Sequence, residues 1–327
     1  MSSNDKKNKI NKKYVLSIIL IILLTLAIIL GIGLYYLNNL LNKIEKVEIK
    51  ESDLGIVPQV QAKLSNFSDI KNVVLFGIDS EEGKSGRSDS IMIATIDTKH
   101  KKLKLTSVMR DSYVHIDGHG KDKLNHAYAF GGPKLAIKTL NETFHLNIKD
   151  FASVNFSTLP KIINTIGGVD IDIQENEINF INHMVLNLNH LYNTKSPQIQ
   201  TAGLQTIDGT QAMAYCRIRY TVGGDYRRAE RHRIVLTKVF EKIKKLPTIK
   251  YPNLLNELLP MIKTSLDSKE ILSIANDIFS FDNIVIEQAR FPKDKDSKGE
   301  LIKGVYYLIF DKESTINDMH KWLFEDK

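Results

Sequence analysis

A long uncharged, aliphatic run near the N-terminus constrains this chain more than any other feature of its sequence. Residues 14–42 contain no Asp, Glu, Lys or Arg, and residues 18–32 are almost wholly aliphatic. A helix needs about 20 apolar residues to cross the hydrocarbon core of a bilayer. Tyrosines at both ends of the run, Tyr14 and Tyr35 among them, suit the two interfaces, where aromatic rings lie at headgroup level. The sequence therefore predicts a transmembrane signal anchor over residues 14–37.

The charges around this run predict the orientation of the chain. Residues 1–13 carry five lysines and one aspartate, and lysine-rich flanks stay in the cytoplasm. We therefore expect a cytoplasmic basic tail over residues 1–13, a single pass through the cell membrane, and the C-terminal bulk outside the cell. A cleaved signal peptide is the alternative, but its apolar region is only about 7–15 residues long and precedes an A-x-A-like site, which this sequence lacks. The polar stretch 38–70 is interpreted as a juxtamembrane stalk.

The overall composition is that of an ordinary globular protein. It is 43% hydrophobic and 25% charged, which excludes the disordered and collagen-like classes. The single cysteine, Cys216, excludes an intramolecular disulfide and a multi-cysteine metal site. The net charge is +7, of which the basic tail contributes +4, five lysines less one aspartate. Only +3 is left for the rest of the chain, so a basic binding surface has to be found locally.

Beyond residue 70, short β-rich runs alternate with helical stretches. Runs rich in Val and Ile predict strands at 73–78, 90–97, 103–109, 169–173 and 212–218. Capping signals and apolar periodicity predict helices at 132–144, 157–166, 225–245, 268–279 and 314–324. Such alternation is typical of an α/β fold. We expect one extracellular α/β domain over residues 71–327, with a mixed central β-sheet flanked by helices on both faces.

The placement of arginine is the most informative feature of this domain. The chain has 45 Lys and Arg residues, but only nine are Arg, and six of those nine lie between Arg217 and Arg233. A planar and always-charged guanidinium suits bidentate recognition of phosphate or carboxylate. Arg217 and Arg219 lie two apart at the end of the predicted strand 212–218, so both should point to one face of the sheet.

In the helix that follows, basic and apolar residues share one stripe. Arg228, His232, Val235 and Val239 are separated by four, three and four residues, a spacing that places them on one helix face. The two basic residues should therefore face the core together with the valines. Inward-facing cations near a helix N-terminus form an anion site. The alternative is a solvated basic helix face, the usual place for a run of charges.

Two aspartates at strand ends suit a hard cation. Asp79 ends the first predicted strand, and Asp89 follows a loop that contains Gly83. Mg²⁺ typically takes one or two carboxylates together with substrate phosphates, although turn chemistry alone accounts for Asp in a glycine-rich loop. Arg110 and Asp111 form another pair at a predicted strand exit, for which a surface ion pair is the alternative.

A series of short motifs connects these features. In order they are FGIDS (76–80), GRSDS (86–90), SVMRD (107–111), DKLNHAYAFGGP (122–133), VNF (154–156), GGV (167–169), LQTIDG (204–209), RIR (217–219) and GDYRRAER (224–231). Together they resemble the LytR-CpsA-Psr family of membrane-anchored cell-wall glycopolymer transferases. The resemblance extends over roughly residues 71–240 and the anchor.

The resemblance implies a phosphotransferase that takes a teichoic acid or capsule-like glycan from a polyprenyl diphosphate carrier and attaches it to a peptidoglycan sugar hydroxyl. It implies Mg²⁺, with Mn²⁺ as a substitute, held by Asp79 and Asp89, and catalytic roles for Arg110, Asp111 and Arg219. The residues implied to bind the diphosphate are Arg87, Arg110, Arg217, Arg219, Arg228, Arg231 and His232. The lipid would enter an apolar channel lined by the predicted helices 132–144 and 157–166.

The sequence departs from the family pattern within the arginine-rich segment. His232 stands where the family usually has Gln, and Arg227 stands where it usually has Gly. Residues 220–222 replace acidic residues that commonly follow the Arg pair. A histidine could still donate to a phosphate, but its charge would depend on pH.

Two other functions are compatible with the same sequence features. A polyprenyl diphosphate hydrolase would use the same site with water as the acceptor, and no readable acceptor motif separates it from a transferase. A membrane-bound regulator is the other alternative, because the family is also described in terms of transcriptional attenuation. The predicted topology places the arginine cluster outside the membrane, and orientation alone explains the basic tail, so no nucleic-acid partner is expected.

Overall fold

The computed structural model describes residues 35, 37–80, 86–219, 223–281 and 284–325, and it separates into two compact units, Met1–Lys43 and Ile44–Lys327. The predicted cytoplasmic tail and nearly all of the predicted membrane anchor lie outside the described residues. Within the described part of the chain, no helix is both long enough and apolar enough to span a bilayer. The second unit contains all the named strands and helices.

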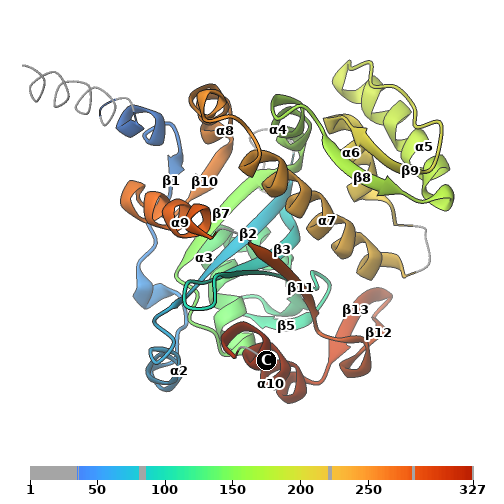
Figure 1. Cartoon of the computed structure of the whole chain (residues 1–327). Helices are drawn as coiled ribbons and strands as arrows, with labels where there is room; N and C mark the ends of the chain where they lie inside the picture. The colour runs from blue at the N-terminus through green and yellow to red at the C-terminus, as the bar shows by residue number, and fades with distance from the viewer. Residues whose placement is uncertain (1–34, 36, 81–85, 220–222, 282–283, 326–327) are drawn as a thin grey trace, which may run out of the picture. The chain divides into compact units, whose positions relative to one another are not determined.

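A seven-stranded mixed sheet forms the centre of the second unit (Figure 1). Its strand order is β1 (Glu45–Lys46), β10 (Ile262–Thr264), β7 (Asp150–Asn155), β2 (Ile70–Asp79), β3 (Arg87–Asp97), β4 (Lys102–Val108) and β11 (Val285–Phe291). The pairs β2/β3, β3/β4 and β10/β7 are antiparallel, whereas β2/β7, β4/β11 and β1/β10 are parallel. Three two-stranded sheets accompany it: β5 (Tyr113–Ile116) with β6 (Gly120–Lys123), β8 (Val169–Ile173) with β9 (Gly203–Ile207), and β12 (Ser297–Ile302) with β13 (Val305–Phe310).

One face of the sheet is covered by α3 (His126–Phe144) and α10 (Lys312–Phe324). Val74 and Phe76 of β2 pack there with Ile137 and Leu140 of α3, and all four side chains are almost fully buried. Helix α3 is broken at Gly131 and Gly132, just before Pro133. The predicted helix start at residue 132 therefore coincides with a real break inside a longer element.

The opposite face is covered by α7 (Gly224–Lys244) and α9 (Ser268–Ser280). Alternate residues of β2 point to this side, so Val73 packs with Phe240 of α7 and Ile274 of α9. Figure 1 shows α7 crossing the sheet on this side. The predicted α/β fold, a mixed sheet with helices on both faces, is confirmed.

A second core lies beside the sheet, on the far side of α7. It is built by α4 (Leu159–Thr165), α5 (Glu175–Tyr192), α6 (Gly209–Arg217) and α8 (Tyr251–Leu258) together with β8 and β9. Ile171, Val185, Met213 and Val235 are buried in this cluster. Helix α7 contributes Val235 and Val239 to this second core and Phe240 to the cluster on the sheet.

The predicted strand 212–218 is wrong, because this segment belongs to helix α6. Asp208 caps the helix: its carboxylate accepts a hydrogen bond from Gln211 N (2.9 Å), and Gln211 Oε1 accepts one from Asp208 N (2.8 Å). This reciprocal capping box is a helix start signal. Since residues 209–216 are buried all round, they carry no helical period in their apolar pattern, which made the helix resemble a strand.

The predicted stalk also differs from the structure, since the compact unit begins at Ile44 rather than at residue 71. Strand β1 extends the sheet, and α2 (Pro58–Leu64) follows it. Leu54 and Leu64 are buried in the core shared with α3. Single apolar residues within a charged stretch provide these contacts, so the polar composition of residues 38–70 did not reveal them.

Candidate active site

A cavity of about 260 Å³ lies where the end of β2, the end of α6 and the first turns of α7 meet. Its charged lining consists of Asp79, Asp89, Arg217, Arg219 and Arg228. Three guanidinium groups against two carboxylates make this small space net positive, and a cleft lined by one dominant sign of charge concentrates ions of the opposite sign. We call it the arginine cavity.

Pairing of β2 with β3 brings the two predicted metal carboxylates to the arginine cavity. Asp79 is the last residue of β2, and its half-exposed carboxylate lies 3.4 Å from Arg217 Nη2. Asp89 is the third residue of β3 and is buried. Its Oδ1 accepts a hydrogen bond from Asn125 Nδ2 (3.1 Å), and its Oδ2 lies 2.5 Å from Arg110 Nη1.

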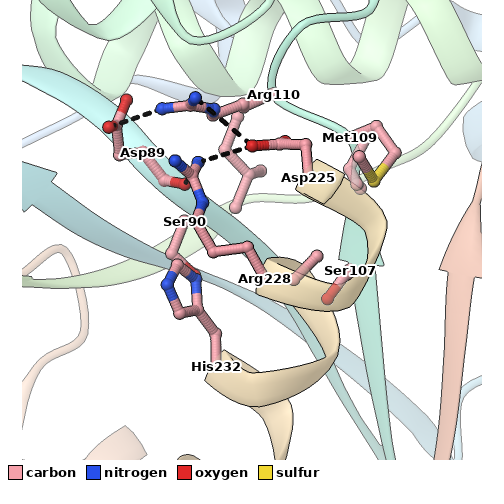
Figure 2. A pocket seen from close by; sticks show the side chains of 11 residues that line it. Asp89, Ser90, Ser107, Met109, Arg110, Asp225, Arg228 and His232 are labelled. Carbon is pink, nitrogen blue, oxygen red and sulfur yellow. Dashed lines mark hydrogen bonds and ion pairs between the residues drawn. The ribbon is translucent and has the colours of Figure 1, made fainter. Parts of the chain in front are cut away.

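Arg110 is held between two carboxylates behind the cavity (Figure 2). Besides Asp89, it contacts Asp225 in the first turn of α7, with 3.3 Å between Arg110 Nη2 and Asp225 Oδ1. The same Asp225 oxygen lies 3.2 Å from Arg228 Nη2, which also donates to the Asp89 carbonyl at 3.3 Å. Acidic and basic groups therefore alternate along a chain of four side chains, and each one fixes the next.

The alternating charges influence the pKa values of Asp89, Arg110 and Arg228. Burial disfavours the ionised form of Asp89, but Arg110 and Arg228 outweigh that effect and hold its pKa below the ordinary value. Burial likewise opposes the charge of Arg110, yet Asp225 and Asp89 raise its pKa. For Arg228 the effect of burial is larger than the attraction to Asp225, so the pKa of Arg228 is lowered. Its buried Nε has no hydrogen-bond partner within the described residues, and the same is true of Arg110 Nε.

The start of α7 depends on two consecutive glycines. Gly223 has φ +96° and Gly224 has φ +48°, a region that side-chain-bearing residues seldom adopt. The turn they make places Asp225 in the first helical turn, where an acidic side chain is stabilised by the helix dipole. Asp225 is then one turn from Arg228 and faces Arg110. Sequence reasoning assigned no role to Asp225, although its position three residues before Arg228 was a readable signal.

His232 lies one turn after Arg228, as its helical spacing predicts, but it is not a cationic ligand. It is buried, and its Nε2 donates to the Cys216 carbonyl at 3.0 Å. Burial, reinforced by Arg228, lowers its pKa to about 3. The ring is therefore neutral near pH 7, with its only N–H directed at the backbone. The expectation that His232 binds the diphosphate directly is corrected on this point.

Arg217 and Arg219 both line the arginine cavity, although the strand expected to carry them is a helix. Arg217 ends α6, and Ile218 after it is extended, so residues two apart still reach the same side. Arg219 is the more exposed of the two, with 54% of its side chain accessible, and its Nη2 lies 3.9 Å from Asp89 Oδ2. These two guanidinium groups are open to a ligand from solvent.

Besides Arg110, three predicted site residues do not line the arginine cavity within the described residues. Arg87 begins β3 opposite Asp79 and is exposed. Arg231 is fully buried on the side of α7 that faces the second core, where its Nε and Nη2 lie 3.0 and 2.9 Å from Glu177 Oε1. The diphosphate-binding role expected for Arg231 is therefore corrected to a structural one. Asp111 faces Lys123 Nζ at 2.8 Å and Arg110 Nε at 3.5 Å.

An apolar cavity of about 220 Å³ adjoins the arginine cavity. It lies between the sheet and α4 and α7, and Leu75, Met92, Leu159, Ile162 and Val239 contribute to its lining. Phe156, Cys216 and His232 line both cavities, so the two are neighbours. The expected contribution of helix 157–166 is present in Leu159 and Ile162. The contribution expected from helix 132–144 is not, because α3 packs on the opposite face of the sheet.

The residues at Asp79 and Asp89 fit a magnesium ion that binds together with a phosphate. The described residues contain no group of three or more His, Cys, Asp or Glu arranged to hold a metal, so this part of the chain offers two carboxylates and no complete cage. Mg²⁺ commonly binds through one or two carboxylates and completes its shell with water and substrate phosphates. Asn125 Oδ1, which has no hydrogen-bond partner within the described residues, lies on the side chain that donates to Asp89.

Known proteins resemble this chain in sequence and in fold. The model of the LytR_cpsA_psr family matches residues 34–323. A polyisoprenyl-teichoic acid–peptidoglycan teichoic acid transferase TagU of Enterococcus faecalis is 35% identical over 212 residues, which are 63% of this chain and 65% of that protein. The protein of the same name from Oceanobacillus iheyensis is 28% identical over 304 residues, 89% of this chain and 88% of that protein.

A solved structure shares the fold. The LytR-CPS2A-psr family protein YwtF (TagT) with bound octaprenyl pyrophosphate lipid has a TM-score of 0.59 and 26% sequence identity to this chain, and the match covers 79% of this chain and 90% of that one. The lipid diphosphate named in that related structure has an anionic part and an apolar part, which are complementary to the cationic and apolar cavities that adjoin each other here.

Proposed function

Since this chain belongs to the LytR_cpsA_psr family, we propose that it transfers an anionic glycopolymer, a wall teichoic acid or capsule-like glycan, from a polyprenyl diphosphate carrier to a sugar hydroxyl of peptidoglycan. The observation that carries the proposal is the contact between the two cavities. Phe156, Cys216 and His232 line both. A ligand that fills both must be anionic at one end and apolar at the other, as a polyprenyl diphosphate is.

The three arginines of the arginine cavity bind the diphosphate in this proposal. Arg217 and Arg219 are accessible and present guanidinium groups that can bridge two phosphate oxygens. Arg228 approaches from the buried side and is incompletely satisfied by the protein. Phosphoryl transfer depends mainly on positioning and on neutralising charge, which fixed cations supply without reorganisation.

Arg110 acts in this proposal mainly as a positioning residue. Its guanidinium is shared between Asp89 and Asp225, and through Asp225 it fixes Arg228. Loss of Arg110 would leave Asp89 with a smaller compensating charge and would release the start of α7. Mg²⁺, bound by Asp79 and Asp89 when present, would neutralise diphosphate oxygens; Mn²⁺ favours the same oxygen ligands.

The reaction proposed is an in-line displacement. The oxygen of the acceptor hydroxyl forms a bond to the phosphorus that carries the glycan, and the bond from that phosphorus to the bridging oxygen breaks. Polyprenyl phosphate leaves with the bonding electron pair, and the hydroxyl proton passes to Asp111. Lys123 Nζ and Arg110 Nε lie 2.8 and 3.5 Å from the oxygens of the Asp111 carboxylate and hold it in position. The product is a phosphodiester between glycan and peptidoglycan.

The uncharged N-terminal run supports a location of this chemistry at the membrane. We propose that residues 14–37 anchor the protein by a single pass in the cell membrane, with residues 1–13 in the cytoplasm and the catalytic domain outside. Tethering near the leaflet that holds the lipid carrier raises the local concentration of the donor.

A single reaction tests the function. The full chain in detergent receives a synthetic polyprenyl-diphosphate-linked glycan, Mg²⁺ and peptidoglycan fragments, and mass spectrometry follows the products. We expect a glycan-phosphate adduct that is lost in Arg219→Ala and kept in the matched control Arg227→Ala. Arg227 is on α7 and pairs with Glu230, outside the arginine cavity. Cleaved lipid without adduct would instead make the protein a diphosphate hydrolase, and binding without either product would contradict both reactions.

A further inference from the structure

A third cavity, of about 310 Å³, lies on the other side of the Arg110–Asp225 pair. Asp111, Asp225, Tyr226 and Tyr306 supply its polar lining, and we call it the tyrosine cavity. Asp225 contacts Arg110 and Arg228 and also lines the tyrosine cavity. This carboxylate therefore lies between the tyrosine cavity and the two arginines. Nothing in the proposed binding of the donor uses this space.

The hairpin β12–β13 forms one wall of the tyrosine cavity and is fixed to the rest of the molecule. Leu308 N donates to the Asp111 carbonyl at 2.9 Å, and Leu308 also pairs with Ser112 in an isolated β-bridge. On the other side, the Tyr226 hydroxyl lies 3.3 Å from Ser297 Oγ at the start of β12. The hairpin is therefore tied both to the strand exit that carries Asp111 and to the first turn of α7.

The two tyrosine rings are held in place by their neighbours. The Arg290 guanidinium carbon lies 3.9 Å from the centroid of the Tyr226 ring, which covers one face of that ring. Tyr306 lies across Gly299, where an added Cβ would be 2.5 Å from Tyr306 Cε2. The glycine thus makes room for the ring, which is still 45% exposed. Rigid aromatic surfaces of this kind lose little conformational entropy when they bind a ligand.

The charge of the tyrosine cavity differs from that of the arginine cavity. Its described lining contains two carboxylates and two phenols but no Arg or Lys. A diphosphate would find no Arg or Lys in this described lining, whereas a neutral polyhydroxyl ligand would find acceptors in Asp111 and Asp225 and flat apolar faces on the rings. Binding sites of small ligands combine aromatic walls with a few placed polar groups in this way. A pyranose ring meets both requirements, with C–H groups on its faces and hydroxyls on its edge.

The position of the tyrosine cavity suits the attacking group rather than the donor. The apolar cavity adjoins the arginine cavity at His232, and it shares no lining residue with the tyrosine cavity in the described part of the chain. In an in-line displacement, the nucleophile enters opposite the leaving group. Polyprenyl phosphate leaves toward the apolar cavity, so the acceptor hydroxyl enters from a different side. The tyrosine cavity shares no described lining residue with the arginine cavity, but its Asp225 lies 3.2 Å from Arg228, which lines the arginine cavity.

We infer that the tyrosine cavity is the subsite for the acceptor, a pyranose unit of an uncharged peptidoglycan glycan strand that stacks on Tyr306 and directs a hydroxyl at Asp111. This inference rests on the proposed function and adds the place of the acceptor to it. Tyr306 is then a residue that determines use of the acceptor and has no part in binding the donor.

The test separates the two substrates kinetically. For the full chain in detergent, initial rates are measured against soluble uncross-linked peptidoglycan fragments and, separately, against the lipid-linked donor. We expect Tyr306→Ala to raise the KM for the acceptor by about tenfold, the size of one lost aromatic contact, with the KM for the donor unchanged. Gly299→Ala, which crowds the same ring, should shift the acceptor KM in the same direction by less. Tyr192→Ala, whose side chain is 40% exposed on α5, is the matched control.

Each outcome decides the question. An unchanged acceptor KM in Tyr306→Ala, with thermal unfolding like that of wild type, overturns the inference and leaves the transferase in place. A rise in donor KM alone overturns it in favour of a subsite for the donor glycan. Calorimetric titration of the same fragments, without donor, should show binding to wild type that is weaker by about tenfold in Tyr306→Ala. If wild type forms no adduct with any donor, the proposed function fails first, and the acceptor assignment fails with it.

Discussion

Two arginines three residues apart on α7, Arg228 and Arg231, are neighbours on the helix surface but contact different parts of the molecule. Arg228 is 4% exposed and Arg231 is 1% exposed, so burial does not distinguish them. Arg231 contacts Glu177 through Nε and Nη2 and donates from Nη1 to the Ile218 carbonyl at 3.3 Å. Arg228 contacts a carboxylate that it shares with Arg110, and its Nε has no partner among the described residues.

The two guanidinium groups differ in whether their positive charge is balanced by a carboxylate of their own or by a shared one. The charge of Arg231 is balanced by the carboxylate of Glu177, which is itself buried, with 3% of its side chain exposed. Arg228 faces a cavity in which cations outnumber carboxylates. A buried arginine is therefore a candidate ligand-binding residue when its partners are shared, and a structural one when they are its own. Four measurements test this contrast.

The largest expected effect is on the structural member. Arg231→Ala should lower the free energy of unfolding by about 3–5 kcal/mol, because it leaves the carboxylate of Glu177 buried without a counter-charge. Urea unfolding of the full chain in detergent measures the change. The double variant Arg231→Met/Glu177→Leu should recover most of the loss, since no charge is then buried. A single variant as stable as wild type would show that the pair is not the fixed element described here.

Arg228→Ala should instead lower the rate of transfer by about 10²–10³-fold, the usual cost of removing a fixed donor from a developing charge. Its effect on unfolding should be smaller than that of Arg231→Ala, because Asp225 keeps Arg110 as a partner. Initial rates and urea unfolding of the same samples test both halves. Equal destabilisation by the two variants would remove the distinction between them.

Sequence periodicity could predict that Arg228 faces the core, but it could not predict the ion pair between Arg231 and Glu177. Helix α7 has a solvent side and a core side, so the stripe of Arg228, His232 and Val235 is visible in the sequence. The partner of Arg231 is on α5, 54 residues away, a helix that was not expected at all. A local pattern shows which side of a helix faces inward, but the charge that meets it there comes from elsewhere in the chain.

The same limit applies to the rest of the fold. The strands around 73–78, 90–97 and 103–109 were predictable because Val and Ile runs end at Gly, Asp or Lys. Helix α6 was missed because its residues are buried all round. The tyrosine cavity could not be anticipated either, since Tyr226 and Ser297, whose contact closes it, are 71 residues apart. Family resemblance supplied the residues of the donor site, but it assigned no role to Asp225 and no place to the acceptor.

The third measurement concerns pH and the buried, neutral His232 beside Arg228. The pKa of His232 is about 3 in the folded protein and about 6.5 when unfolded, so between these values the unfolded chain binds more protons. Stability contributed by His232 is therefore present above pH 6.5 and lost as the pH falls, by about 2 kcal/mol at pH 5. His232→Gln, whose amide can still donate to the Cys216 carbonyl, should flatten this decline between pH 7 and 5. A parallel decline in both proteins would show that His232 titrates normally.

The smallest effect is expected where the guanidinium is most open to solvent. Arg219→Lys keeps the positive charge at the mouth of the arginine cavity but loses the planar pair of donors. We expect kcat/KM for the donor to fall by about tenfold, with no change in unfolding, because the side chain is 54% exposed and its nearest carboxylate contact is 3.9 Å. Arg227→Lys, on the same scale of exposure but outside the cavity, should leave the rate unchanged. An Arg219→Lys variant as active as wild type would mean that this position supplies charge alone, and that the bidentate contact to the diphosphate is made deeper in the cavity, by Arg228.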